Sequence, residues 1–305
     1  MIDKHLAPVI IFACNRPEHT SELIKSLDKN HETEKTKFYF FIDLPRDSNL
    51  FPQHTKVIEL VSSWQHVDKE IYTREENFGL KKNIISGITQ VSKKYPKFIV
   101  LEDDLVVSEN FLNYMNYCLN RFENNEMVFH INAYNYRNFI GSNKNIYRSS
   151  LLFPWGWASW SKVWEKFMNH DYPTKNLIKT LPKNEIKKFN FYNLSYLANY
   201  SNQLILNENK KINTWFVFWY QFIFLNKKIS ITPQQSFVKN KGFDGSGENS
   251  GENKIMETNI NSAKIKNYKY RSNQFNLNFI NSVFFHLKYN LYDKFNYHVL
   301  RRFND

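Results

Sequence analysis

The sequence predicts an α/β protein in which helices flank a mostly parallel central sheet. Short apolar runs alternate with segments of helical spacing over the first 110 of its 305 residues. Strands separated by helices are typical of βαβ units, which build parallel sheets. Polar residues follow the predicted strands, at the edge where open parallel sheets bind ligands. We therefore expect one α/β domain over residues 1–253, followed by a helical carboxyl-terminal extension.

The predicted elements follow one another regularly along the chain. Pro8–Cys14 is an apolar run long enough for a buried strand, and Thr20–Leu27 has helical spacing. Further strands are expected at 37–42, 71–73 and 97–101, and further helices at 55–64, 80–91 and 109–121. The second half is less regular. Residues 174–211 are polar with helical spacing, which indicates a helical insertion.

Composition excludes several classes of protein. The chain has 41 Lys and Arg against 29 Asp and Glu, a formal net charge of +12, with 42% hydrophobic residues. This content supports a large core and excludes wholesale disorder. The mean hydropathy of −0.57 argues against a polytopic membrane protein. Cys14 and Cys118 are too few for a disulfide framework or a zinc site. No signal-peptide pattern opens the sequence, so a cytoplasmic location is expected.

Three carboxylates end the fourth predicted strand: Glu102, Asp103 and Asp104. In an extended chain Glu102 and Asp104 would point one way and Asp103 the other. Adjacent negative charges repel unless a cation or basic group compensates them. Carboxylate oxygens suit Mg²⁺ or Mn²⁺, which complete their shells with phosphate oxygens and water. The triplet thus indicates a divalent cation beside a diphosphate. A cap for the next helix, helped by Ser108, is the alternative.

Three segments together resemble the GT-A glycosyltransferases, namely Ile11–Pro17, Asn77–Leu80 and Leu101–Leu105. The similarity is to the inverting N-acetylglucosaminyltransferase I of the Golgi and to bacterial, family 2-like transferases that build surface polysaccharides. It covers Pro8 to about Trp164 and, more loosely, 213–251. The resemblance implies a Rossmann-like GT-A fold and transfer of a sugar from a nucleoside diphosphate donor.

The resemblance assigns a role to each acid of the triplet. In this family the triplet is the DxD element, which binds Mn²⁺ and the nucleotide-sugar. Asp104 matches the acid that binds the metal directly, so Mn²⁺ or Mg²⁺ is the implied cofactor. Glu102 and Asp103 match the acids that contact the ribose and the sugar of the donor.

The resemblance also implies a nucleotide-binding corner. Arg16 matches an arginine that contacts the nucleotide, and Asp43 matches an aspartate that reads uracil. Lys81 stands where the Golgi enzymes have a histidine near the base, so the recognition of uracil departs from the family pattern there. Asn15 and Asn77, which follow predicted strands, complete the expected donor site.

A tryptophan-rich stretch is similar to the acceptor-side segment of many such transferases. Aromatic faces stack on the C–H faces of sugar rings, and Gly156 permits a close approach. Trp157, Trp160 and Trp164 also have helical spacing, which favours core packing. We expect Trp155 and Trp157 to contact the acceptor and the other two to pack in the core.

The catalytic base is not evident from the sequence. An inverting transfer needs a carboxylate that accepts the proton of the acceptor hydroxyl. The Golgi relatives place it in a segment that matches Thr214–Trp219, where this chain has no acid. Asp171, Asp244 and Glu248 are the alternatives, and Asp244 is favoured. A retaining enzyme would not need this base, so the stereochemical outcome stays open.

Two further segments carry lysine and arginine residues that suggest a function. Residues 239–251 are rich in glycine and predict a mobile loop, in which Lys239 and Lys241 are placed to meet a diphosphate. A surface loop without function is the alternative. Residues 254–305 form a basic segment with apolar helical spacing from Phe279 to Val299, which suits an anionic membrane surface. A helix packed back on the domain is the alternative.

Together these features predict a metal-dependent hexosyl- or N-acetylhexosaminyltransferase. It would move a sugar from a UDP-sugar to a saccharide acceptor, such as a lipid-linked precursor of lipopolysaccharide or capsule. Its place would be peripheral, on the inner face of the cytoplasmic membrane, with no nucleic-acid partner. A sugar- or nucleotide-binding protein without catalysis is one alternative. A nucleic-acid-binding protein, suggested by the pI of about 9.4, is another, but it does not explain the triplet.

Overall fold

The structure is a computed structural model, and it describes residues 6–135, 144–170, 181–190, 199–242, 244, 258–261 and 268–271. The chain divides into two compact units. The first takes in the described residues within 1–169 and 227–271, and the second takes in those within 170–226. The boundaries of the predicted domains stay a prediction.

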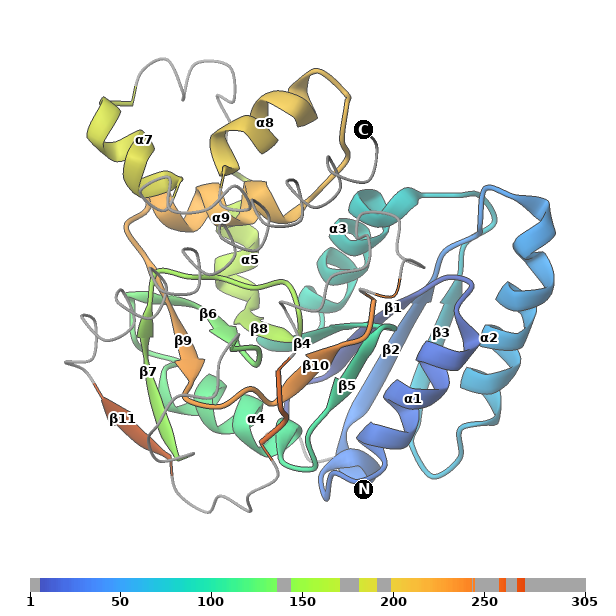
Figure 1. Ribbon diagram of the computed structural model, residues 1–305. Coiled ribbons are helices and arrows are strands. Elements are labelled where there is room, and N and C mark those ends of the chain that lie inside the picture. Colours follow the sequence, from blue (N-terminus) through green and yellow to red (C-terminus); the bar gives the residue numbers. More distant parts are fainter. Residues whose placement is uncertain are drawn as a thin grey trace, which may run out of the picture. The chain divides into compact units, whose positions relative to one another are not determined.

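A mostly parallel central sheet forms the first unit (Figure 1). Among the described residues its strand order is β11-β7-β9-β6-β8-β4-β1-β2-β3. Strands β3, β2, β1 and β4 run parallel to one another, whereas β8 pairs antiparallel with both β4 and β6. The predicted α/β architecture is therefore confirmed. The strands of this sheet are β1 (Val9–Ala13), β2 (Lys37–Ile42), β3 (Asp68–Thr73), β4 (Lys97–Glu102), β6 (Val128–Asn132), β7 (Asn145–Ser149), β8 (Trp157–Trp160), β9 (Ile229–Pro233) and β11 (Lys269–Arg271).

Helices connect and cover these strands. They are α1 (Pro17–Leu27), α2 (Phe51–Ser63), α3 (Gly79–Ser92), α4 (Phe111–Arg121) and α5 (Ser161–Met168). In the view of Figure 1, α1 lies in front of the sheet and α3 behind it. Two short strands, β5 (Leu105–Val107) and β10 (Val238–Asn240), pair separately. Every residue of β1 is buried, as expected of a strand with helices on both faces.

Helix α3 approaches the sheet closely at Gly87. A Cβ atom there would lie 2.7 Å from Cε1 of Phe12 and 2.9 Å from Cδ2 of Phe41. Both rings are buried, and their centroids lie 5.7 Å apart in a stacked arrangement. Glycine at this position therefore sets the distance between the helix and the first two strands.

Several elements begin earlier or later than the sequence predicts. Strand β3 starts at Asp68 because it pairs along the whole of β2, where Lys37 Nζ lies 2.5 Å from Asp68 Oδ1. Helix α2 starts at Phe51, with Pro52 in its first turn, a position that proline favours. Helix α4 starts at Phe111 and lacks a side-chain cap at Asn110, so the predicted start at residue 109 is wrong.

The second unit contains α7 (Lys183–Phe189), α8 (Tyr200–Glu208) and α9 (Phe216–Leu225). Aromatic rings join these helices. Tyr200 stacks on Tyr220 with ring centroids 4.1 Å apart, and Phe189 lies 5.3 Å from Tyr220. The basic segment predicted over 254–305 lies outside the described residues, apart from 258–261 and 268–271.

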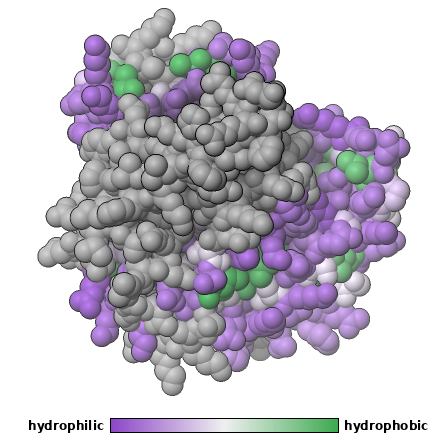
Figure 2. Space-filling view, in the orientation of Figure 1, coloured by the Kyte–Doolittle hydropathy of each residue, from purple (hydrophilic) through white to green (hydrophobic). Residues whose placement is uncertain are grey.

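Apolar side chains are mostly buried, and the described surface is mainly hydrophilic. Figure 2 shows small, separate hydrophobic patches among hydrophilic residues on the face that it presents. The large hydrophobic side chains that remain exposed are Phe51, Met127, Met168 and Ile205, on different elements. Within the described part of the chain, no helix has both the length and the apolar character needed to cross a membrane.

Candidate functional site

The acidic triplet lies where β4 ends and the chain turns into β5. Strand β4 ends at Glu102, and Asp103 and Asp104 form the turn. The amide of Asp103 donates to the carbonyl of Phe12, 2.9 Å away, which places the turn at the carboxyl edge of β1. Asp103 and Asp104 both face Arg16. The expectation that they point in opposite directions is therefore wrong, because side chains alternate only along an extended strand.

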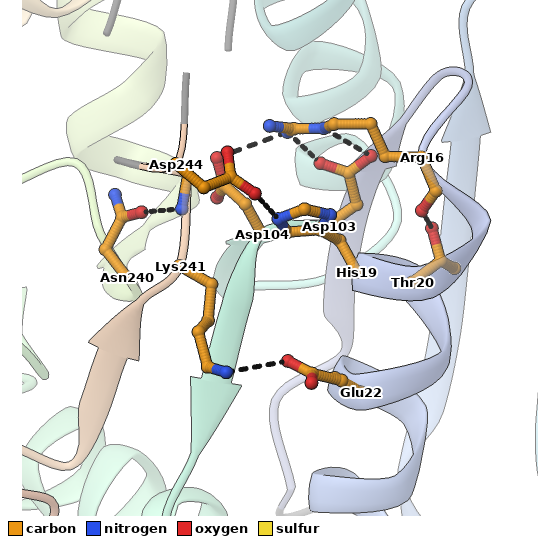
Figure 3. A network of polar contacts seen from close by, with 10 residues as sticks. Arg16, His19, Thr20, Glu22, Asp103, Asp104, Asn240, Lys241 and Asp244 are labelled. Atoms are coloured by element: carbon orange, nitrogen blue, oxygen red, sulfur yellow. Dashed lines mark hydrogen bonds and ion pairs between the residues drawn. The ribbon is translucent and has the colours of Figure 1, made fainter. Parts of the chain in front are cut away.

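Arg16 follows β1, precedes α1 and compensates the triplet (Figure 3). Its Nη2 donates to Oδ1 of Asp103 and lies 3.2 Å from Oδ2 of Asp104, while its Nε lies 3.4 Å from Oδ2 of Asp103. Burial lowers the pKa of Arg16, but Asp103 and Asp104 together raise it well above its ordinary value. A guanidinium group is thus the cation that faces these carboxylates.

Burial also changes the protonation of the triplet. Burial and repulsion from Asp104 raise the pKa of Glu102 to about 8, against the attraction of Arg16. Burial likewise raises the pKa of Asp103, and Arg16 opposes that shift. The triplet therefore carries less negative charge at neutral pH than three isolated carboxylates would.

Asp104 is more accessible than its neighbour and is the acid best placed to hold a cation. Its side chain is 14% exposed, compared with 3% for Asp103. A Cβ atom on Gly242 would lie 2.2 Å from Oδ2 of Asp104, so a larger residue would collide with this oxygen. Within the described residues, no group of three or more His, Cys, Asp or Glu side chains is arranged to hold a metal. One carboxylate with a bound diphosphate and water fits Mg²⁺ or Mn²⁺, which rarely use an all-protein cage.

Residues 240–242 reach this corner from the second half of the chain. Strand β10 pairs antiparallel with β5, and the amide of Lys241 donates to the carbonyl of Asp104, 2.8 Å away. The amide of Gly242 donates to Oδ1 of Asn240 at 2.7 Å. These bonds hold the start of the predicted glycine-rich loop against the acidic turn.

Two ion pairs join the same segment to α1 (Figure 3). Nε2 of His19 lies 3.1 Å from Oδ2 of Asp244, and Nζ of Lys241 lies 3.3 Å from Oε2 of Glu22. The structure thereby brings Asp244, the favoured candidate for the base, to the same corner as the triplet. Its two alternatives, Asp171 and Glu248, lie outside the described residues. His19 could not be identified from the sequence, since no local pattern pairs a helix residue with so distant an acid.

Asp43 and Asn77 join two loops at the edge of the sheet. Oδ1 of Asp43 accepts from the amides of Leu44 at 3.0 Å and Phe78 at 2.8 Å. Nδ2 of Asn77 donates to the carbonyl of Leu44 at 2.5 Å, and its Oδ1 accepts from Nε of Arg46 at 3.0 Å. Both side chains thus shape the loops, and their contacts with a nucleotide stay a prediction.

One histidine and one lysine, His54 and Lys81, also belong to the helices next to this edge. His54, on α2, is 8% exposed, and its Nε2 has no hydrogen-bond partner among the described residues. Burial lowers the pKa of His54, while Asp43 raises it. His54, Val57 and Val61 share one helix face, a spacing that would have revealed His54 as buried. Lys81 lies in the first turn of α3, where burial lowers its pKa.

Asn15 and the tryptophans have different surroundings. Asn15 lies half-buried in the bend before α1. Trp157 is fully buried in β8 and stacks on His130, with ring centroids 5.2 Å apart. No face of Trp157 is open to a sugar ring, which corrects its predicted role as an acceptor contact. Trp155 is half-buried and meets Tyr134 edge to face at 4.7 Å.

The sequence matches one protein family over more than half of its length. The family described as the GNT-I family matches residues 2–175. The alpha-1,3-mannosyl-glycoprotein 2-beta-N-acetylglucosaminyltransferase of Arabidopsis thaliana is 19% identical over an alignment of 172 residues, which covers 53% of this chain and 39% of the plant protein. The chain thus spans about two fifths of the length of that curated relative.

Solved structures also resemble this chain at low identity. TarS 1-349 from S. aureus in complex with UDP has 12% identity and a TM-score of 0.32, over 41% of this chain and 34% of that chain. Mannosyltransferase PcManGT from Pyrobaculum calidifontis, in complex with GDP-Man and Mn2+, has 8% identity and a TM-score of 0.40, over 74% and 71% of the two chains.

Proposed function

Because the chain belongs to the GNT-I family, we propose that it is a metal-dependent glycosyltransferase that moves a sugar from a UDP-sugar to a saccharide acceptor. The name of the plant relative makes N-acetylglucosamine the first sugar to test. One observation carries the proposal beyond family membership. Arg16 and the Asp103–Asp104 turn come together at the carboxyl edge of β1 and β4, where sheets of this class bind ligands.

The donor side of the proposed reaction uses the acidic turn and Arg16. Asp104 would hold Mn²⁺ or Mg²⁺, and such a cation neutralises the charge that develops on a departing diphosphate. Arg16 would donate to the diphosphate from the same side, since its side chain is 20% exposed. Asp103 keeps Arg16 in place through two nitrogen contacts, a role that adds to the sugar contact expected of it.

The acceptor side uses Asp244 as general base. Its side chain is 47% exposed, so it remains within reach of an acceptor hydroxyl. The carboxylate would take the hydroxyl proton as the oxygen attacks the anomeric carbon, which gives inversion of configuration. A positioned general base of this kind typically contributes about 10²- to 10⁴-fold in rate.

The acceptor itself is proposed to be lipid-linked, such as a precursor of lipopolysaccharide or capsule. Residues 264–303 hold eight Lys or Arg and one acid, Asp293. Basic residues close to an anionic membrane each contribute about 1 kcal/mol of binding free energy. A peripheral position at the membrane would place the enzyme beside such an acceptor.

A thermal-shift screen with nucleotides tests this function. UDP with Mn²⁺ should raise the melting temperature, because a ligand at 100 times its Kd stabilises the folded state by about 2.7 kcal/mol. UDP-N-acetylglucosamine with Mn²⁺ should then release UDP. Asp104→Asn is the matched control, in which both effects are lost. Absence of any shift with nucleotides would reject the proposal, whereas binding without turnover would favour a binding protein that has lost catalysis.

A further inference from the structure

His19 connects the first helix to the predicted catalytic base. It lies in the first turn of α1, and its Nε2 is 3.1 Å from Oδ2 of Asp244, a distance at which an imidazole N–H donates to a carboxylate. The imidazole is 16% exposed, compared with 47% for the carboxylate. Figure 3 shows its ring directed from the helix toward Asp244. The more buried partner of this pair is therefore the one on the helix.

The contact between His19 and Asp244 offsets repulsion among neighbouring carboxylates. The corner gathers four carboxylates, three from the triplet and one from Asp244. Arg16 pairs with Asp103 and Asp104. A further carboxylate brought to this place is repelled by the others unless a donor or cation meets it. His19 supplies that donor, with its Nε2 lying 3.1 Å from Oδ2 of Asp244.

A second contact provides a natural comparison. Lys241, in the same segment, pairs with Glu22, one helical turn further along α1, with a distance of 3.3 Å between Nζ and Oε2. This pair also holds the segment to the helix, but it does not involve the proposed base, Asp244. Loss of the Glu22 contact therefore tests only the attachment of the segment to the helix, whereas loss of the His19 contact also tests the orientation of Asp244.

We propose that His19 is a positioning residue, which holds the carboxylate of Asp244 beside the acidic turn in the orientation needed to accept the acceptor's proton. This inference rests on the proposed function, because it takes Asp244 as the base. Catalytic groups tolerate little displacement: a shift of about 1 Å can lower the rate about 100-fold. Loss of His19 should therefore lower the turnover and leave the donor site unchanged.

The test compares His19→Ala, His19→Gln and Glu22→Gln with the unaltered protein. UDP release from UDP-N-acetylglucosamine, with Mn²⁺ and water as acceptor, gives kcat and KM, and calorimetry gives the Kd of UDP. His19→Ala should lower kcat about 10- to 100-fold, with the Kd of UDP unchanged within about twofold. His19→Gln should recover most of the rate, because the glutamine amide can donate to Asp244. Glu22→Gln should stay within about twofold of the unaltered protein.

A double variant shows whether His19 acts through the base. In an Asp244→Asn background, His19→Ala should cause no further loss, since the group that it orients is already gone. An equal loss in both backgrounds would overturn the inference. So would a loss in Glu22→Gln as large as that in His19→Ala, or a failure of His19→Gln to recover activity.

Amide hydrogen exchange tests whether His19 holds this segment in place, and it does not depend on enzyme activity. The amides of Lys241 and Gly242 donate to Asp104 and Asn240, so exchange in a peptide spanning 238–244 reports on this segment. His19→Ala should speed its exchange. Unchanged exchange would overturn the role of His19 even if the unaltered protein released no UDP. Absence of UDP release with faster exchange would instead count against the proposed function alone.

Discussion

Arg16 and Asp103 form a part-buried ion pair between the ends of two adjacent parallel strands. Two guanidinium nitrogens contact the carboxylate, although the residues are 87 positions apart in the sequence. The Asp103 side chain is 3% exposed and that of Arg16 is 20% exposed. The pair therefore anchors the turn that presents Asp104, and the two neighbouring aspartates have different roles.

Substitutions at the two aspartates should affect different properties: the stability of the fold for Asp103 and the binding of UDP with Mn²⁺ for Asp104. Asp103→Asn leaves the partly buried charge of Arg16 without its main partner. It should lower the free energy of unfolding by about 2 kcal/mol, less than the 3–5 kcal/mol of a fully buried pair, because Arg16 keeps some solvent access. Asp104→Asn should change stability little and remove the stabilisation by UDP with Mn²⁺. Urea unfolding and calorimetry measure the two effects. Equal destabilisation by both variants would contradict this division.

Substitutions at Trp155 and Trp157 should also affect different properties of the protein. Trp157→Ala creates a cavity in the core and should cost about 3–5 kcal/mol of stability. Trp155→Ala removes a half-buried ring and should cost less, while raising the KM for a saccharide acceptor. Thermal melts and steady-state kinetics measure these changes. If Trp155→Ala left KM unchanged for an accepted saccharide, its predicted role would be wrong.

Gly87→Ala tests the close contact between α3 and the sheet. Alanine favours a helix by about 1 kcal/mol over glycine, but its Cβ would press on two buried rings. Overpacking typically costs about 1–3 kcal/mol, so we expect net destabilisation in urea unfolding. A double-mutant cycle with Phe12→Leu provides the control, because a smaller neighbour should relieve part of the loss. A more stable Gly87→Ala protein would show that the sheet accommodates the methyl group.

Buried His130 should make stability depend on pH. Burial lowers its pKa to about 3, against hydrogen bonds with Asn132 and with the backbone of Phe153. In the unfolded chain the histidine titrates near 6.5. Its contribution is therefore fully present above pH 6.5 and is lost as the pH falls toward 3, because the unfolded chain then binds a proton that the folded one does not.

The expected slope is about 1.4 kcal/mol per pH unit between these values. Urea unfolding of the unaltered protein and of His130→Gln at several pH values between 7 and 4 measures it. The variant should show a shallower decrease over this range, whatever its stability at pH 7. Parallel curves would mean that His130 is protonated in the folded state.

Local patterns were enough to predict much of the fold. The runs that became β1, β2 and β4 are continuously apolar, because each of these strands is covered on both faces, and such runs stand out in a sequence. Strand β3 was predicted only in part. It is half-buried, and its first residues are polar and paired with β2, so they lack the apolar signal.

The sequence by itself determined the α/β class, the order of the first strands and helices, and the place of an acidic triplet at a strand end. Only the tertiary structure decided that Asp103 turns toward Arg16, that Trp157 is buried, and that His19 meets Asp244. The physical reason is the range of the interactions. Periodic burial acts over a few residues and leaves a pattern in the chain, whereas a turn between strands and contacts between distant segments depend on how the elements pack together.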